Sequence, residues 1–445
     1  AIAVGQLTGL SAAEIQDGLG MMCSSFGIIL TFNYQWLGSL EEWAFRLLYE
    51  VTGHYNYTIL ASMGILVILL GLVVMAWATR RLIRTMIGVV MPGESDNLSD
   101  LIFSNLQLSK GPKVVVIGGG TGLSVMLRGL KAKTYNLTAV VTVADDGGST
   151  GRIRQDLDII APGDLRNCLV ALADKEGLME KLFAHRFGGS GNLTGHSFGN
   201  LFIAALIEVL GDVEEAMDAT SKVLRVRGKV IPSSAEKLRL NAEMTDGRIV
   251  EGESQIPHAH GKIKRVFTTP EHPRAIQSAV DAIREADAIV LGPGSLYTSI
   301  MPNLCVPDIV QAVRTSKAPK IYICNVMTQP GETDDYTVSD HIRAINRQAG
   351  GKVIDFVIAN NGDVDPAVLQ RYVAHGSHPV MIDKKEVSQT GATLILSDLI
   401  NKENSATHDT KKLANVLFDL INALRTDLSP ELLHYYLKRY TFNHR

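Results

Sequence analysis

The stretch that decides the fold is Lys113–Leu123, which is KVVVIGGGTGL. It begins with an apolar, β-branched run that predicts a buried strand. Glycines follow at once from Gly118 to Gly122, and residues Leu123–Lys131 after them have a helical pattern. A strand, a glycine turn and a helix in this order are typical of the first unit of a parallel α/β sheet.

The same alternation continues toward the C-terminus. Apolar runs predict further buried strands at Leu137–Val143, Ala288–Gly292, Lys320–Val326 and Lys352–Asn360. Helical patterns occur at Asn200–Leu210, Arg274–Ala286 and Ser339–Gly350. Nearly continuous apolar strands are expected where helices cover both faces of a sheet. We therefore predict a Rossmann-like, doubly wound parallel sheet of the α/β class over residues 112–400.

Two segments depart from this alternation. Residues Arg239–Val266 have short pieces separated by turns, which predicts a β-hairpin excursion. Residues 401–445 form a predicted helical extension, in which apolar residues recur at helical spacing: Leu413, Val416, Leu417, Leu420, Ile421 and Leu424. Such a stripe indicates packing in the core or between copies, and we expect a homo-oligomer.

The N-terminal part, residues 1–91, predicts a membrane anchor. Tyr57–Ala78 is an apolar run about as long as a helix needs to cross a bilayer. Arg80, Arg81 and Arg84 follow it and place that end in the cytoplasm. A buried helix of a soluble domain is the alternative. Residues 13–34 form either a first membrane span or a helix in the membrane interface, and residues 92–111 form a linker. The predicted location is the cell membrane, with the main domain in the cytoplasm.

Charge and cysteine content exclude some classes of protein. The net charge of −3 leaves no basic excess for nucleic-acid binding, so no nucleic-acid partner is expected. The four cysteines are scattered without a CxxC pair: Cys23, Cys168, Cys305 and Cys324. This pattern indicates a reducing compartment and argues against a disulfide framework.

The glycine turn after the first strand predicts an anion site. Glycines let the backbone approach a ligand closely, and a helix start offers free N–H groups to an anion. Candidate ligand-binding residues are therefore Gly119, Gly120, Thr121 and Gly122. The turn differs from the GxGxxG fingerprint, because Leu123 stands where the third glycine would fall, and no Walker Gly-Lys-Ser/Thr follows. The alternative is a tight turn without a ligand.

A second motif, DDGGSTGR, lies at the end of the second predicted strand. Asp145 and Asp146 could accept from ribose hydroxyls or hold Mg²⁺, and Arg152 could bind a phosphate. The carboxyl edge is where open α/β sheets bind their ligands. The alternative is a solvated turn with an N-cap aspartate.

Further polar motifs follow. GDLRN contains Asn167, and TGHSFGNL contains His196 and Asn200, which we assign to the binding site. A lone histidine is more often structural than an acid or base. GPGSLYTS repeats the glycine turn with Gly294, Ser295, Leu296 and Tyr297, and NVMTQPGET begins with Asn325. A second helix start in the same sheet predicts a ligand with more than one anionic handle.

Six motifs in this order resemble the gluconeogenesis-factor family (YvcK-like proteins): GGGTGLSVML, DDGGSTGRIR, GDLRN, TGHSFGNL, GPGSLYTSI and NVMTQPGET. That family shares a superfamily with the 2-phospho-L-lactate transferases of deazaflavin-cofactor synthesis (CofD-like). The resemblance covers Lys113 to Asn360 and leaves out the N-terminal apolar run.

The resemblance implies a protein that binds UDP-sugars, above all UDP-N-acetylglucosamine, without established catalysis of its own. It also implies a regulatory role that links carbon metabolism to peptidoglycan precursor supply and cell shape, with a cell-wall precursor enzyme as the regulated partner. The transferase branch instead moves a phospholactyl group from a nucleotide-activated donor onto a deazaflavin with Mg²⁺ assistance. The DDGGSTGR stretch matches the gluconeogenesis-factor branch.

The residues and the resemblance agree on the ligand. A diphosphate that bridges the two glycine turns would meet Gly119–Thr121 on one side and Gly294–Leu296 on the other. Tyr297 would then pack on the uracil or the sugar ring, and the alternative is a tyrosine that packs on the sheet. An NAD-dependent oxidoreductase, suggested by the fold class alone, is disfavoured by the missing third glycine.

Overall fold

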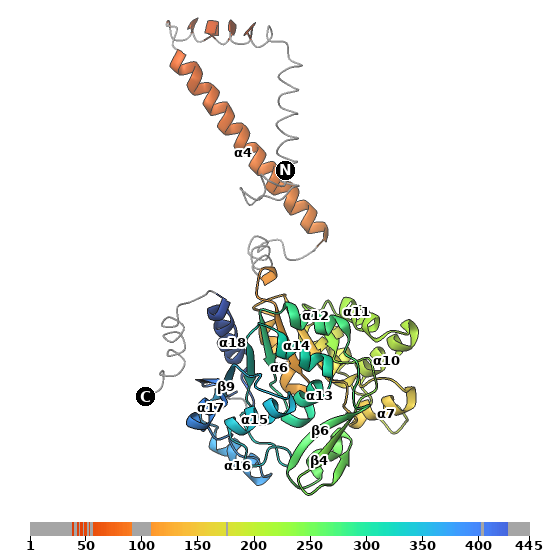
Figure 1. Cartoon of the computed structure of the whole chain (residues 1–445). Coiled ribbons are helices and arrows are strands. Elements are labelled where there is room, and N and C mark those ends of the chain that lie inside the picture. Colours follow the sequence, from red (N-terminus) through yellow and green to blue (C-terminus); the bar gives the residue numbers. More distant parts are fainter. Residues whose placement is uncertain are drawn as a thin grey trace. The chain divides into compact units, whose positions relative to one another are not determined.

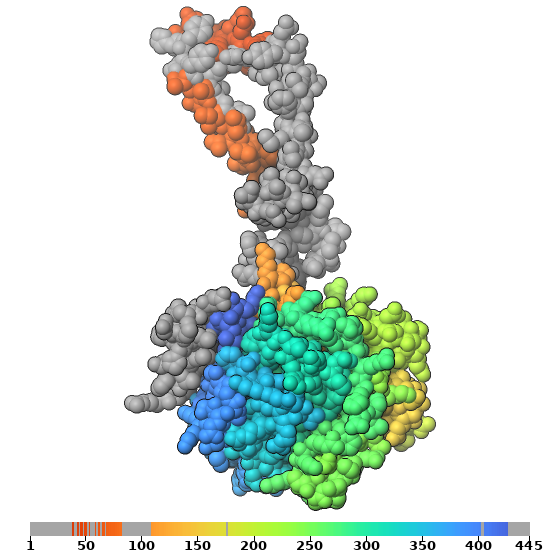
Figure 2. Space-filling view, viewed as in Figure 1, coloured from red at the N-terminus to blue at the C-terminus, as the bar shows by residue number. Residues whose placement is uncertain are grey.

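The computed structural model describes residues 57–90, 108–174, 177–401 and 405–425, and some positions between 38 and 53. The chain divides into two compact units, Ala1–Asp100 and Leu101–Arg445, which we describe separately. Figures 1 and 2 colour the chain from red at the N-terminus to blue at the C-terminus.

The described part of the first unit includes the long helix α4 (Tyr57–Val90). This helix continues without a break through Arg80, Arg81 and Arg84, so the apolar run is not a separate element. Among the residues that the structure describes, no helix combines the length and the hydropathy that a bilayer crossing needs. The membrane-spanning helix predicted at 57–78 is therefore not supported. The first span predicted at 13–34, most of the linker at 92–111 and residues 426–445 lie outside the described residues.

The second unit is built on a seven-stranded parallel sheet in the order β10-β9-β8-β7-β1-β2-β3. Its strands are β1 (Val114–Gly118), β2 (Leu137–Val141), β3 (Lys229–Pro232), β7 (Ala288–Leu291), β8 (Lys320–Ile323), β9 (Phe356–Asn360) and β10 (Thr393–Ser397). All residues of β1 and β7 are buried, as expected of strands covered on both faces. The predicted doubly wound α/β fold is confirmed, although the sequence patterns missed β3 and β10.

Helices pack around this sheet, as Figure 1 shows. Helix α6 contacts α8 and α18, and α12 contacts α14. The helices are α6 (Gly120–Leu130), α7 (Gly148–Leu157), α8 (Gly163–Leu172), α9 (Gly177–Ala184), α10 (Phe198–Leu210), α11 (Val213–Val223), α12 (Gln277–Glu285), α13 (Met301–Leu304), α14 (Pro307–Thr315), α15 (Val338–Gln348), α16 (Pro366–Ala374), α17 (Lys384–Thr390) and α18 (Thr410–Arg425), with two short turns of helix, η2 (Glu253–His258) and η3 (Leu296–Ile300).

A second, antiparallel sheet interrupts the alternation. Strand β4 (Arg239–Met244) pairs with β5 (Ile249–Glu251) on one side and β6 (Ile263–Thr269) on the other. Figure 1 shows β4 and β6 side by side. The predicted β-hairpin excursion is confirmed and gains a third strand, and its η2 segment brings Glu253 toward the parallel sheet.

The apolar stripe of α18 packs in the core of the second unit. Leu413, Leu417 and Ile421 are fully buried, and α18 lies against α6. The two helices approach closely at Gly129 of α6, where a Cβ atom would lie 2.5 Å from the Thr410 carbonyl oxygen and 2.6 Å from the Cβ of Ala414. The stripe therefore serves core packing, one of its two predicted roles.

Candidate functional site

The site lies where the strand order of the parallel sheet reverses. Strand β1 is central, with β2 on one side and β7 on the other. Chains that leave the carboxyl ends of two such neighbouring strands in opposite directions open a crevice between them, and ligands bind there in open α/β sheets. The two glycine turns follow β1 and β7, so both border this crevice.

A cavity of about 580 Å³ occupies the crevice. Its walls come from the start of α6, the turn after β7, the segment after β8, and more distant segments: Gly120, Thr121, Gly122, Val125, Glu253, Pro293, Gly294, Ser295, Thr298, Ser299, Asn325 to Pro330, Tyr372, His375, Ser377, Ala406, Thr407 and His408. The volume falls within the range of small-molecule sites.

The first glycine turn begins α6, with Gly119 as its N-cap. Gly120 has a φ of +69°, which favours glycine, and its N–H donates to Asp164. The N–H groups of Thr121 and Gly122 belong to the first turn of the helix and have no acceptor within it. They line the cavity, so this turn presents donors and the positive end of the helix dipole to a ligand.

The second glycine turn presses directly against the first. A Cβ atom at Gly122 would lie 2.9 Å from the Pro293 carbonyl oxygen, so this contact requires glycine. Ser295 is held by the segment after β8. Gln329 Nε2 donates to Ser295 Oγ at 2.6 Å, and Asn325 Nδ2 donates to Gln329 Oε1 at 3.2 Å. The predicted residues Gly294, Ser295 and Asn325 therefore share one wall of the cavity.

The helix start after the second turn is occupied by a carboxylate of the chain itself. Glu332 accepts from the Tyr297 N–H at 3.3 Å, from the Thr298 hydroxyl at 3.2 Å and from the Thr298 N–H. Burial raises the pKa of Glu332 to about 7. The second anion site predicted at this helix start gains no support, because Glu332 already accepts from the Tyr297 and Thr298 donors.

Tyr297 and Leu296 lie in the buried core and not in the cavity wall. Tyr297 is 2 % exposed, its hydroxyl lies 2.7 Å from that of Tyr336, and neither Tyr297 nor Leu296 lines the cavity. The predicted packing of Tyr297 on a base or sugar ring is therefore not supported by its position. It is a core tyrosine, which the sequence had left as the alternative.

The two aspartates after β2 bind backbone N–H groups. Asp145 accepts from Gly147 at 2.9 Å, and Asp146 accepts from Ser254 at 2.9 Å, which ties the loop to η2. Burial raises the pKa of Asp145. Neither aspartate lines the cavity. In the described part of the chain, no three His, Cys, Asp or Glu side chains are arranged to hold a metal ion, so the predicted Mg²⁺ gains no support.

Two further carboxyl groups lie closer to the first glycine turn. Asp164 is 9 % exposed, and burial raises its pKa to about 6. Glu253 lines the cavity, and one of its carboxylate oxygens is buried without a hydrogen-bond partner among the described atoms. Burial and the neighbouring Asp145 and Asp164 raise the pKa of Glu253 well above its usual range. This side of the site is acidic.

The remaining predicted residues make contacts within the protein. Arg152 Nη2 donates to the Thr194 carbonyl at 2.9 Å. His196 Nδ1 lies 3.3 Å from Ser149 Oγ, and Asn200 Nδ2 donates to the same oxygen at 3.3 Å. Asn167 Oδ1 accepts from Arg166 at 2.6 Å. Arg152, His196 and Asn200 thus connect α7 with α10 and the segment before it, whereas the Asn167 bond stays within α8. None of these four residues lines the cavity.

Comparison with known proteins now assigns the family. Residues 114–400 match the family described as 2-phospho-L-lactate transferase CofD. The chain belongs to the CofD family. Within it, the chain is 50% identical over 311 residues to the gluconeogenesis factor of Bacillus subtilis, covering 70% of this chain and 98% of that protein. It is 48% identical over 312 residues to the gluconeogenesis factor of Halalkalibacterium halodurans, covering 70% and 97%.

A solved structure supports the same assignment. A crystal structure of a Bacillus halodurans protein is 48% identical and has a TM-score of 0.68, covering 69% of this chain and 99% of that protein. The predicted resemblance to gluconeogenesis factors is confirmed.

In this CofD-family chain, the far wall of the cavity comes from residues that the sequence patterns did not identify. Tyr372 and His375 come from α16 and the turn after it, and Thr407 and His408 from the segment after β10. His408 is 8 % exposed, and its Nε2 has no partner among the described atoms. A prediction of β10 would have drawn attention to this segment, because ligand residues follow the carboxyl ends of strands.

Proposed function

We propose that this member of the CofD family is a regulatory protein that binds a UDP-sugar, with UDP-N-acetylglucosamine as the ligand. The observation that carries the proposal is the cavity at the strand-order reversal, with the first turn of α6 in its wall. The names of the curated relatives support a role as a gluconeogenesis factor.

The diphosphate binds at the first glycine turn. Thr121 and Gly122 supply N–H donors, and the Ser295 hydroxyl on the facing turn lies within the same cavity. Glu332 closes the second helix start, so the ligand has one anion anchor instead of two. The sugar hydroxyls lie toward Glu253, which lines the cavity and whose carboxyl group exchanges hydrogen bonds with them.

Calorimetry on the full chain tests this assignment. UDP-N-acetylglucosamine should bind, and GDP and NAD should bind at least about tenfold more weakly. One mismatched donor or acceptor in a buried site is enough to lower the affinity about tenfold. Equal affinity for all three ligands would overturn the proposal. A titration in which none of the three ligands binds would overturn it as well.

Regulation through a partner is part of the proposal. The ligand-bound chain acts on an enzyme of cell-wall precursor supply and thereby affects cell shape. Titration of the purified chain into such an enzyme with and without UDP-N-acetylglucosamine measures the effect. A turnover rate that does not depend on the chain under either condition would contradict it. Sedimentation of the same samples tests the predicted homo-oligomer.

A transferase is the second candidate function, because the matching family is described by that activity. It would move a phospholactyl group from a nucleotide-activated donor to a hydroxyl group of a deazaflavin and release the nucleotide. Incubation of the purified chain with both substrates and Mg²⁺ decides the question, since a deazaflavin phosphodiester would appear only if the chain is a transferase.

A further inference from the structure

A second hollow, of about 540 Å³, lies between α15 and α17. It is lined by three cations, by polar side chains and by one glycine, and by no acidic or apolar side chain: Arg343, Arg347 and Lys352, with Asn346, Gln389 and Thr390. The cavity at the strand-order reversal differs in charge, because its wall includes Glu253 and neither lysine nor arginine. The wall of the hollow therefore suits an occupant with negative charge and little apolar surface.

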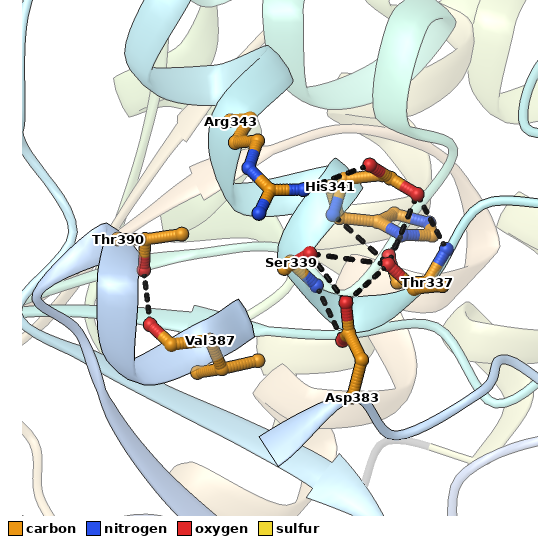
Figure 3. Close-up of polar contacts among 8 residues, drawn as sticks. Thr337, Ser339, His341, Arg343, Asp383, Val387 and Thr390 are labelled. Carbon is orange, nitrogen blue, oxygen red and sulfur yellow. Dashed lines mark hydrogen bonds and ion pairs between the residues drawn. The ribbon is translucent and has the colours of Figure 1, made fainter. Parts of the chain in front are cut away.

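The two helices that form the hollow are tied to each other. Asp383, which precedes α17, accepts from the Thr337 hydroxyl at 2.7 Å and from the Ser339 N–H at 3.0 Å, both at the start of α15. Figure 3 shows this carboxylate joining the two helices, with Arg343 on α15 and Thr390 on α17. These bonds hold the two walls of the hollow relative to each other.

The positive charge of the hollow is only partly neutralised. Arg343 forms an ion pair with Asp340 at 3.2 Å. Neither Arg347 nor Lys352 forms an ion pair within the part of the chain that the structure describes. Arg343 and Arg347 are one helical turn apart on α15, so their side chains are neighbours on one face of the helix. Two such like charges repel each other, and an anion bound between them removes the repulsion.

The helix ends do not use up the donors of these cations. A basic side chain near a helix end often serves the last carbonyl groups of the helix. In α15 those groups already accept from the backbone N–H groups of residues 349–351. In α17 the Gly391 N–H donates to the Ser388 carbonyl oxygen in the same way. The donors of Arg347 and Lys352 can therefore serve a ligand.

We propose that this hollow is a second anion site, which binds a small molecule that carries two or more phosphate charges. Arginine forks hold phosphate oxygens in pairs, and a lysine adds a point charge. The volume falls within the range of small-molecule sites.

The position of the hollow makes it independent of the first cavity. Helices α15 and α17 are followed by β9 and β10, so the hollow lies at the amino ends of these strands. The first cavity lies at the carboxyl ends of the strands. The two ligands therefore do not compete, and the inference does not depend on the proposed function.

Calorimetry with sodium pyrophosphate on the full chain tests the proposal. The wild type should bind pyrophosphate with an affinity that falls as sodium chloride is added. Arg347→Gln and Lys352→Gln each remove one positive charge from the wall and should each weaken binding at least about tenfold. Both side chains are exposed, so the melting temperature should stay close to that of the wild type.

Arg284→Gln provides a matched control. Arg284 is an exposed arginine in the last turn of α12, as Arg347 is in the last turn of α15, and it does not line the hollow. This variant should keep the pyrophosphate affinity within about threefold. An equal loss of affinity in Arg284→Gln and Arg347→Gln would show a general charge effect and overturn the proposal.

A further variant separates the two sites. Gly120→Asp places a negative charge in the wall of the first cavity and should keep pyrophosphate binding within about threefold, because the second hollow is unchanged. Loss of binding in Gly120→Asp with wild-type affinity in Arg347→Gln would place pyrophosphate at the first glycine turn. That result would overturn this inference and leave the proposed function standing. A wild type that binds no pyrophosphate overturns the inference as well.

Two other probes distinguish the source of the charge. A glutamate tetrapeptide represents an acidic protein segment and should bind at least about tenfold more weakly than pyrophosphate, because its charges lie farther apart. Vesicles of phosphatidylcholine and phosphatidate present phosphate on a lipid, and Arg347→Gln should float with them to the same extent as the wild type. Tighter binding of the peptide, or reduced flotation of the variant, would assign the hollow to a protein or a lipid surface and overturn the proposal.

Discussion

Gly120 combines a conformational and an electrostatic requirement. Its φ of +69° disfavours side chains, and it lies in the cavity wall. Gly120→Ala should lower the free energy of unfolding by about 1 kcal/mol through backbone strain. Gly120→Asp should add repulsion of the diphosphate and abolish the rise in melting temperature with UDP-N-acetylglucosamine. An aspartate variant with the wild-type ligand-induced shift would exclude this turn as the phosphate site.

Glu332 makes stability depend on pH. Its folded pKa of about 7 lies above the ordinary 4.5, so the folded chain binds this proton more tightly than the unfolded chain does. The extra stability that this proton gives the folded chain is complete below pH 4.5 and is lost as the pH rises to 7. The loss is at most on the order of 3 kcal/mol.

Glu332→Gln should therefore reduce the fall in melting temperature between pH 5 and pH 8, measured by thermal unfolding. Glu285→Gln, which changes an exposed glutamate bound to Lys113, is the control. If the two variants follow the same pH curve as the wild type, the Glu332 proton does not contribute.

Among single residues, the sequence predicted those whose role depends on their neighbours along the chain. Gly120 and Gly122 were found because a strand precedes them and a helix follows. Glu332 could not be assigned to the start of η3, because that contact joins residues 35 positions apart. His408 and Tyr372 escaped for the same reason, since their place in the cavity depends on how distant segments pack.

The contact between α6 and α18 makes a prediction about an element. In an open helix, Gly→Ala stabilises by about 0.5–1 kcal/mol. At Gly129 a Cβ atom would lie 2.5 Å from the Thr410 carbonyl oxygen, so Gly129→Ala should instead destabilise by about 1–3 kcal/mol. Gly177→Ala in α9 is the control, because a Cβ there meets nothing within 4 Å. Chemical denaturation measures both, and a stabilised Gly129→Ala would disprove the packing.

The elements that sequence patterns missed are those at the margins of the sheet. Strands β3 and β10 form its two edges and have one neighbour each. Three of the five residues of β10 are exposed or half-buried, and β3 begins with an exposed lysine and ends in proline. The central strands were predicted because burial on both faces requires continuous apolar runs. An edge strand has one neighbour and tolerates polar residues and proline, so its sequence pattern is less clear.

The second unit should bind its ligand alone. All cavity residues and both apolar clusters fall within residues 101–445. A fragment of residues 108–445 should therefore match the full chain in UDP-N-acetylglucosamine affinity within about threefold, since no binding contact is removed. A tenfold loss in calorimetry would show that the N-terminal unit takes part. Membrane attachment stays a prediction, and fractionation of the full chain with and without detergent measures it.

The cavity residues are spread widely along the chain, and this spread determines when the cavity can form during synthesis. The first wall residue is Gly120 and the last is His408, which is 408 − 120 = 288 residues later. At about 5–20 residues per second, a ribosome needs roughly 15–60 s to make that stretch. Until the last of these residues has been made, the cavity is incomplete and no ligand can stabilise the nascent chain. The early strands must therefore avoid aggregation without a ligand.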